Sequence, residues 1–167
     1  MSNLRIGLDI DDTIVNFYGT YLSKFGVPKN DFVITKNVYK LKNNRDFWEN
    51  LPKIREINCE VTLYCTKRIS SKTFTRNSLI NNNFPIKPIY QVYTQKGNKA
   101  DKIKGKIDVF IDDSISNVIQ MNKSGIPTLL IDAPHNQKFD YIGRIYSLDY
   151  TEIETVFNLL KNSNFMF

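Results

Sequence analysis

The sequence holds two pairs of aspartates, and each pair follows a run of apolar residues. Asp9 and Asp11 lie two positions apart near the N-terminus, and Asp112 and Asp113 are adjacent in the second half of the chain. Four carboxylates that converge in a partly dry site repel one another strongly, so such a cluster needs a cation. Oxygen ligands without a nearby His or Cys favour a hard divalent ion, and we expect Mg²⁺.

A magnesium ion in such a site usually binds a phosphate oxygen of its substrate, which makes phosphoryl transfer the chemistry to expect. Asp9 can attack phosphorus, while Asp11 acts first as an acid and then as a base. The two-residue step matters because alternate side chains leave the end of a strand on the same side. The hydroxyl of Thr66 and a lysine would hold the oxygens that are not transferred.

These residues must be positioned by the strands and helices that alternate along the chain. The alternation predicts an α/β fold, a three-layer Rossmann-like parallel sheet with right-handed crossovers. Ligands of such sheets bind beyond the carboxyl ends of the strands, where Asp9, Thr66 and Asp112 are expected to meet. Strands are predicted at 4–10, 60–65, 87–93, 107–111, 127–131 and 145–146, helices at 13–25, 46–51, 70–82, 115–124 and 150–161, and a loop or short helix at 94–106.

Residues 29–58 differ in kind from the rest of the chain, since they are polar and lysine-rich with scattered aromatic residues. We predict that residues 17–58 form a small helical cap inserted after the first strand. The core then consists of residues 1–16 and 59–167. The insert holds eight Lys or Arg and four Asp or Glu, so it carries +4 of the formal net charge of +6. A basic cap above a floor of carboxylates would attract a phosphate dianion.

The order of these motifs resembles the haloacid dehalogenase superfamily. The stretch from Asp9 to Thr13 matches its D-x-D-x-T signature, Thr66 matches its second motif, and Asp112-Asp113 matches its fourth. Within the superfamily, the helical insert and the phrase Phe-Trp-Glu-Asn-Leu-Pro at 47–52 are most similar to the small 5′(3′)-deoxyribonucleotidases and their bacterial and phage relatives.

The resemblance implies a role for each acidic residue. Asp9 would be the nucleophile and Asp11 the general acid and base. Asp9, the backbone carbonyl of Asp11 and the carboxylate of Asp112 would hold Mg²⁺, and Asp113 would orient a metal-bound water. Thr66 would bind the phosphate.

The third motif is a lysine without a sharp sequence pattern. In the nucleotidases an Asp-Lys pair stands ten residues before the first acid of the fourth motif, and the resemblance therefore implies Lys102, next to Asp101, as a phosphate-binding residue. Lys99 is the alternative.

Several residues around these motifs are candidates for contact with the substrate. Phe17, Phe47 and Trp48 belong to the insert, and a nucleobase could stack on Trp48 first of all. The alternative is that these aromatic residues pack the cap against itself. Lys67 and Arg68 follow Thr66 and would meet the phosphate or the edge of the base, or remain solvated charges.

The remaining polar residues near the motifs receive structural interpretations. Asp12 is expected to face solvent or to cap a helix, and Ser114 to cap the helix after the second acidic pair. A supporting role of Asn117 for the metal site stays open. His135, the single histidine, receives no role. The two cysteines are expected to be free thiols.

Taken together, the residues predict a cytoplasmic Mg²⁺-dependent phosphomonoester hydrolase. The resemblance favours a 5′(3′)-(deoxy)ribonucleotidase that acts on nucleoside monophosphates, as a monomer or a homodimer. The alternatives are a 3′-phosphatase that acts on nucleic-acid ends and a non-catalytic binding module built on a metal. A membrane partner is not expected, since the sequence has no run of the roughly 20 apolar residues that a bilayer span needs.

Overall fold

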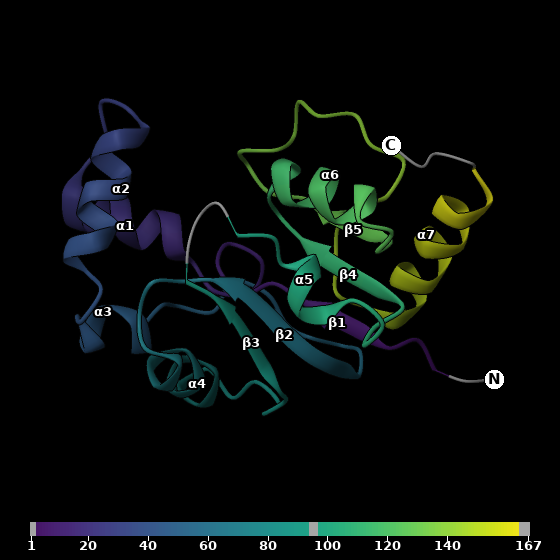
Figure 1. Cartoon of the computed structure of the whole chain (residues 1–167), viewed down its shortest axis with the longest axis horizontal. Coiled ribbons are helices and arrows are strands. Elements are labelled where there is room, and N and C mark those ends of the chain that lie inside the picture. Colours follow the sequence, from purple (N-terminus) through teal and green to yellow (C-terminus); the bar gives the residue numbers. More distant parts are fainter. Residues whose placement is uncertain (1–2, 94–96, 164–167) are drawn as a thin grey trace.

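The computed structural model describes residues 3–93 and 97–163 and places six parallel strands in one sheet (Figure 1). The strand order is β3-β2-β1-β4-β5-β6, which confirms the predicted Rossmann-like α/β fold. The strands are β1 (Ile6–Leu8), β2 (Val61–Lys67), β3 (Ile89–Val92), β4 (Val109–Asp112), β5 (Thr128–Ile131) and β6 (Arg144–Ile145). The helices are α1 (Phe17–Phe25), α2 (Asp31–Lys40), α3 (Arg45–Glu49), α4 (Lys72–Asn81), α5 (Ala100–Ile103), α6 (Ile115–Lys123) and α7 (Tyr150–Asn162).

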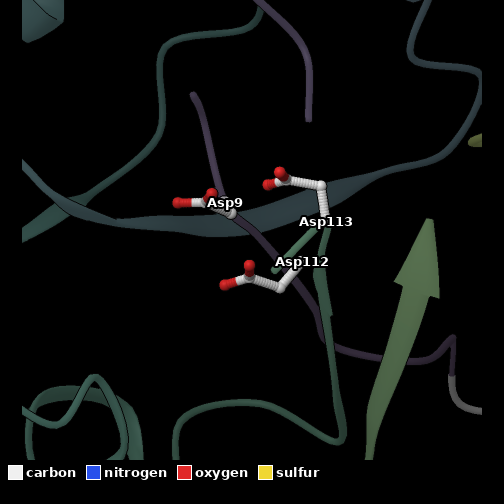
Figure 2. Close-up of side chains that lie close together, drawn as sticks. All are labelled: Asp9, Asp112 and Asp113. Carbon is white, nitrogen blue, oxygen red and sulfur yellow. The ribbon is translucent and has the colours of Figure 1, made fainter. Parts of the chain in front are cut away.

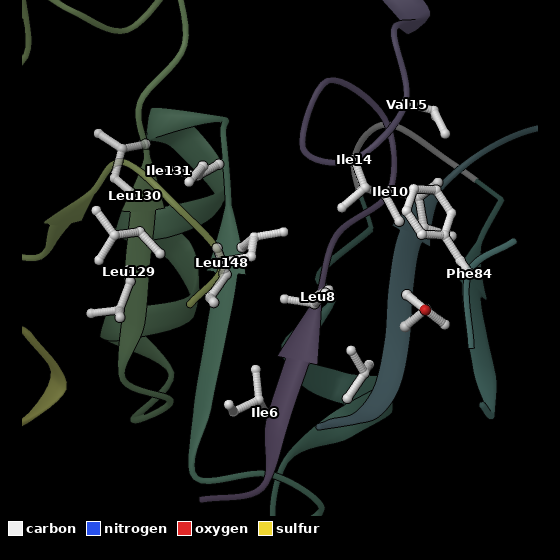
Figure 3. Packing of buried hydrophobic residues seen from close by; sticks show 14 of the residues in the cluster. Ile6, Leu8, Ile10, Ile14, Val15, Phe84, Leu129, Leu130, Ile131 and Leu148 are labelled. Carbon is white, nitrogen blue, oxygen red and sulfur yellow. The ribbon is translucent and has the colours of Figure 1, made fainter. Parts of the chain in front are cut away.

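Helices cover both faces of the sheet, so its strands are apolar on both sides. Along β2, Leu63 and Cys65 point into a cluster with α5 and α6, whereas Val61 and Tyr64 belong to the cluster that contains residues of α4 and α7. Figure 3 shows part of the second cluster, which extends from Ile6 on β1 across to β5. Burial on both faces explains the continuous apolar runs from which the strands were predicted.

The chain reverses its direction of travel across the sheet at β1. From β1 it proceeds outward to β2 and β3, and it then returns to place β4, β5 and β6 on the other side. The neighbours β1 and β4 therefore mark the point at which the strand order reverses. Open sheets of this kind bind their ligands beyond the carboxyl ends of the strands at that point.

The first helix begins later than its apolar spacing predicts. Residues 13–16 were expected to be helical, but α1 begins at Phe17, and Asn16 caps it by accepting a hydrogen bond from the amide of Gly19 at 2.9 Å. The preceding residues form a turn, closed by a 2.7 Å hydrogen bond from the amide of Asp12 to the carbonyl of Val15. Asp12 adopts a φ of 57°, which a helix cannot contain.

The three helices of the insert are held in two different ways. Glu49 on α3 accepts a hydrogen bond from Asn77 of α4 at 2.6 Å, and its carbonyl accepts one from Asn81 of α4 at 2.9 Å. Helices α1 and α2 instead share a small apolar cluster around Tyr21 and Val38, to which Ile69 contributes from the segment after β2. In Figure 1, α1 and α2 stand at one end of the molecule, away from the sheet. The division at residues 17 and 58 stays a prediction.

Two further expectations concern thiols and membranes. Cys59 precedes β2 and Cys65 lies within it, and both are free thiols, as expected. None of the helices among residues 3–93 and 97–163 has both the length and the apolar character that crossing a membrane requires. Residues 94–96 of the predicted loop at 94–106 lie outside the described residues, and α5 occupies part of the remainder.

Candidate active site

Three buried carboxylates meet at the carboxyl ends of β1 and β4 (Figure 2). Asp9 follows β1, and its amide donates to the carbonyl of Ile111 at 2.9 Å, so the pairing with β4 continues to this residue. Asp112 ends β4 and Asp113 follows it. One oxygen of each carboxylate lies within 4.8 Å of the others, and the three side chains could together hold a metal ion.

A lysine ammonium lies between two of these carboxylates. Lys99 Nζ is 2.6 Å from Asp9 Oδ1 and 2.6 Å from Asp112 Oδ2, and the residue is only 1% exposed. Lys102 was expected to bind the phosphate, with Lys99 as the alternative, and the structure brings Lys99 and not Lys102 to the acidic cluster. Lys102 is exposed on α5, because Ala100 and Ile103 form the face of this short helix that packs against the sheet.

Burial dominates the electrostatics of this cluster. It raises the pKa of Asp9 well above its usual range; Lys99 opposes this shift, and the carboxylates of Asp112 and Asp113 add to it. Burial would lower the pKa of Lys99, but Asp112 and Asp9 outweigh it and raise that pKa above its usual range. One ammonium thus compensates only part of the negative charge, and a further cation would favour the ionised form of Asp9.

Asp113 is fixed by residues from two loops. Its Oδ1 accepts a hydrogen bond from the Thr13 hydroxyl at 3.0 Å, and its Oδ2 lies 2.8 Å from His135 Nε2. Asn136 Nδ2 donates to the Asp113 carbonyl at 2.8 Å. The hydrogen bond with Asp113 raises the pKa of His135. No role was expected for His135, and only its place shortly after β5, beside the site, could have indicated this contact.

Asp112 is held by the first turn of α6. The amide of Ser114 donates to Asp112 Oδ1 at 2.9 Å, and Asn117 Nδ2 lies 3.2 Å and 3.1 Å from the two carboxylate oxygens. Ser114 also accepts a hydrogen bond from the amide of Asn117 at 3.5 Å, in agreement with its predicted capping role. Asn117 therefore supports Asp112, one of the three carboxylates that could hold a metal ion.

Asp11 is bound by an arginine rather than by the acidic cluster. Arg68 Nε donates to Asp11 Oδ2 at 2.8 Å and Arg68 Nη2 to Oδ1 at 2.6 Å. Thr66, which is buried at the end of β2, lies 3.4 Å from Asp11 Oδ2 through its hydroxyl. The Arg68 side chain has no exposed surface, so it is not a solvated charge. Arg68 lines the cavity described below, and its contact with the phosphate or a base edge stays a prediction.

A cavity of about 690 Å³ opens over these residues. Asp9, Asp11, Thr66, Arg68 and Asp113 line it near the carboxyl ends of the strands, and Lys99 lines it from the start of α5. Lys67 also lines it, and burial, followed by the charge of Lys99, lowers the pKa of the Lys67 ammonium. Two further groups of residues line the cavity. Ser114 precedes α6, and Ser116 and Asn117 lie on it. The insert contributes Phe17, Asp31, Ile34, Thr35, Val38, Tyr39 and Trp48.

The aromatic residues Phe17, Phe47 and Trp48 of the insert pack against one another. Trp48 is 1% exposed, stacks on Phe17 with 5.6 Å between ring centres, and donates from Nε1 to the Leu41 carbonyl at 2.8 Å. Phe47 is buried and does not line the cavity. Trp48 and Phe47 therefore pack the insert, as the alternative expected. Trp48 also lines the cavity, and the stacking of a base on it stays a prediction. Tyr39, which the sequence analysis passed over, lines the cavity and is 61% exposed.

Asp12 confirms one of its two predicted interpretations. Its Oδ1 accepts a hydrogen bond from the amide of Tyr18 in the first turn of α1 at 2.9 Å. Burial raises the pKa of Asp12 to about 7, although the hydrogen bond from Tyr18 opposes this shift, so Asp12 does not face solvent.

Known protein-family models and curated proteins provide no match for this sequence. Its function is therefore inferred from the acidic cluster and from the cavity that opens over it.

Proposed function

We propose that this protein is a Mg²⁺-dependent phosphomonoester hydrolase that works through an aspartyl phosphate on Asp9. The observation that carries the proposal is the placement of Asp9, which borders the cavity, touches Lys99 at 2.6 Å and shares a buried cluster with Asp112 and Asp113. A nucleophile, a fixed cation and a candidate metal site thus converge at the point where the strand order reverses.

The residues present fit a magnesium ion. The donors in the cluster are all carboxylate oxygens, which is the set that a hard divalent cation prefers. The three carboxylates exceed the single charge of Lys99, so a divalent ion would balance what remains. Asp9 and Asp112, with the backbone carbonyl of Asp11, would hold the ion, and Asp113 is close enough to join them. When bound, the ion would neutralise charge on a phosphate oxygen.

In the first step, an oxygen of Asp9 attacks phosphorus, and the bond between phosphorus and the leaving oxygen breaks. Asp11, in its protonated form, gives its proton to that leaving oxygen. Lys99 and the hydroxyl of Thr66 offset the charge that develops on the remaining phosphoryl oxygens. In the second step, Asp11 removes a proton from water as the water attacks phosphorus, and phosphate leaves while the Asp9 carboxylate is restored.

The same arrangement supports membership of the haloacid dehalogenase superfamily. Asp9, Thr66, Lys99 and Asp112 follow in the order that the resemblance implies, and the lysine that this motif set needs is present once Lys99 takes the place of Lys102. Asp9 and Asp11 both lie in the segment that connects β1 to α1.

A nucleoside monophosphate is the substrate that we favour. A volume of about 690 Å³ lies in the usual range for small-ligand sites, and the cavity extends from the carboxylates to α2. Tyr39 offers an exposed ring on that side, and Ile34 and Val38 add apolar surface. The excess of basic residues in the insert adds attraction for an anion.

The proposal is tested by hydrolysis assays with three esters: deoxyuridine monophosphate, a sugar phosphate and a 3′-phosphorylated oligonucleotide. Each is measured with Mg²⁺ and with EDTA, for the wild type, for Asp9→Asn and for Asp101→Asn as an exposed control. We expect the wild type to hydrolyse the nucleotide in the presence of Mg²⁺. EDTA and the Asp9→Asn substitution should each abolish this turnover, and Asp101→Asn should leave it unchanged. Turnover of the oligonucleotide alone would indicate a nucleic-acid 3′-phosphatase. A folded wild type that releases phosphate from none of the three would indicate a binding module.

A further inference from the structure

Arg68 is a fully buried cation for which the chemistry above has no task. Its side chain has no exposed surface, and its guanidinium donates from Nε and Nη2 to the two oxygens of Asp11 at 2.8 Å and 2.6 Å. Two parallel hydrogen bonds from a planar guanidinium fix both the position and the rotation of a carboxylate. The other contact of the Asp11 carboxylate, with Thr66, is longer, at 3.4 Å.

The core holds Arg68 itself in place. Arg68 Nη1 donates to the Thr75 hydroxyl of α4 at 3.4 Å, and that hydroxyl donates to Gln91 Oε1 of β3 at 2.9 Å. Gln91 Nε2 in turn donates to the carbonyls of Arg68 at 3.0 Å and Ser70 at 2.6 Å. Helix and strand therefore fix both ends of the arginine before any substrate is present.

The insert contacts Arg68 from another direction. The guanidinium carbon lies 5.2 Å from the centre of the Trp48 ring, a cation–π distance. Trp48 is tied to the rest of the insert by its stacking on Phe17 and by its hydrogen bond to Leu41. A continuous set of contacts thus runs from α1 through Trp48 and Arg68 to Asp11.

We propose that Arg68 is the positioning residue for Asp11, an inference that rests on the proposed function. Arg68 borders the cavity, but its side chain has no exposed surface. It holds the Asp11 carboxylate where a proton can pass to the leaving oxygen and return from water. Misplacing such a group by about 1 Å lowers turnover by about 10²-fold. Trp48 and Thr75 are the side chains that keep Arg68 in its own position.

The test compares Arg68→Gln with Arg76→Gln, an exposed arginine on α4. Each is assayed with a nucleoside monophosphate, whose leaving oxygen needs a proton, and with p-nitrophenyl phosphate, whose leaving group departs as a stable anion. We expect Arg68→Gln to lower kcat/KM for the nucleotide about 10²-fold and that for p-nitrophenyl phosphate by less than about threefold. With p-nitrophenyl phosphate, kcat and KM should fall together, because the water-activating step also needs Asp11. Arg76→Gln should change none of these values.

Two further variants complete the test. Asp11→Asn should show the same dependence on the leaving group, and adding Arg68→Gln to it should cause no further loss. If Arg68→Gln does not fold, Arg68→Lys keeps the buried charge but cannot form two parallel hydrogen bonds, and a selective loss of about tenfold is expected.

The possible failures are distinguishable. Equal losses of kcat/KM for both esters in Arg68→Gln or Arg68→Lys would overturn the positioning role while leaving the proposed function intact. So would an additive loss in the double variant. A folded wild type that hydrolyses neither ester would overturn the proposed function and the role of Arg68 with it.

Discussion

Replacing Lys99 by Met should weaken the fold and the activity together, whereas Lys102→Met should affect neither. Lys99 Nζ contacts both Asp9 and Asp112 at 2.6 Å, and its side chain is only 2% exposed. Methionine fills much of the same space without the charge, so two neighbouring buried carboxylates lose their common cation. Lys102 is exposed on α5 and provides a control of the same residue type, three positions away.

The expected loss is large because the two carboxylates stay buried. Removing one partner of a buried ion pair costs about 3–5 kcal/mol, while a change at an exposed site such as Lys102 stays within about 0.5 kcal/mol. The pH dependence has a definite sign. Burial already raises the pKa of Asp9, so the folded state loses stability as the pH rises above about 4, where Asp9 ionises in the unfolded chain. Losing Lys99 raises that pKa further, so the difference in unfolding free energy between the two variants should widen once the pH passes the pKa that Asp9 has in the folded protein with Lys99.

Urea denaturation followed by circular dichroism, at several pH values and without divalent ions, measures this difference. Added Mg²⁺ should then recover part of the stability of Lys99→Met. Equal unfolding free energies for Lys99→Met and Lys102→Met at pH 7, or a gap that narrows as the pH rises, would refute the assignment of Lys99. So would a greater loss of turnover in Lys102→Met than in Lys99→Met.

Three other outcomes follow from local features. A Cβ at Gly7 would lie 2.9 Å from a ring carbon of Phe110, so Gly7→Ala should lower the unfolding free energy by about 1–3 kcal/mol in urea titrations; an unchanged midpoint would contradict this packing. Burial raises the pKa of Cys65 to about 12 and that of Cys59 to about 11, so at pH 8 both thiols should react slowly with a disulfide reagent in the folded protein and rapidly in urea. Tyr39→Ala should raise KM for a nucleoside monophosphate about 5- to 150-fold, which corresponds to the free energy of stacking one base, and leave KM for a sugar phosphate unchanged; equal changes would argue against base stacking there.

The fold could be predicted from the sequence because each layer leaves a local signal. Strands buried on both faces read as apolar runs, and the polar residue at the end of each run marks the edge at which the site forms. This reasoning predicts that Asp9, Thr66 and Asp112 lie at that edge. In the structure, Asp9 and Thr66 line the cavity, and Asp9 and Asp112 belong to the acidic cluster.

The start of the first helix could not be predicted from spacing alone. Apolar residues recur at helical steps from Ile14 onward. The chain around Asp12, which has a positive φ, nevertheless forms a turn, and Asn16 caps the helix so that it begins only at Phe17. Both effects depend on backbone geometry that the apolar pattern does not record.

The lysine and the arginine of the site depend on three-dimensional context. Lys99 and Lys102 lie one helical turn apart, and the packing of α5 decides which of them is buried; the apolar residues Ala100 and Ile103 were the available signal. Nothing in the sequence reveals that Arg68 pairs with Asp11, since 57 residues separate them. His135 likewise reaches Asp113 only because the loops after β4 and β5 lie side by side.

The central claim, covalent catalysis by Asp9, is tested most directly by trapping the intermediate. The protein would be mixed with a radiolabelled nucleoside monophosphate and Mg²⁺, quenched rapidly in acid and digested, and the labelled peptide would be identified by mass spectrometry. Label that hydroxylamine releases should appear on the peptide containing Asp9, increase in Asp11→Asn, in which water is no longer activated, and be absent from Asp9→Asn. Rapid phosphate release with no label on Asp9 in any variant, or label on another residue, would contradict the account.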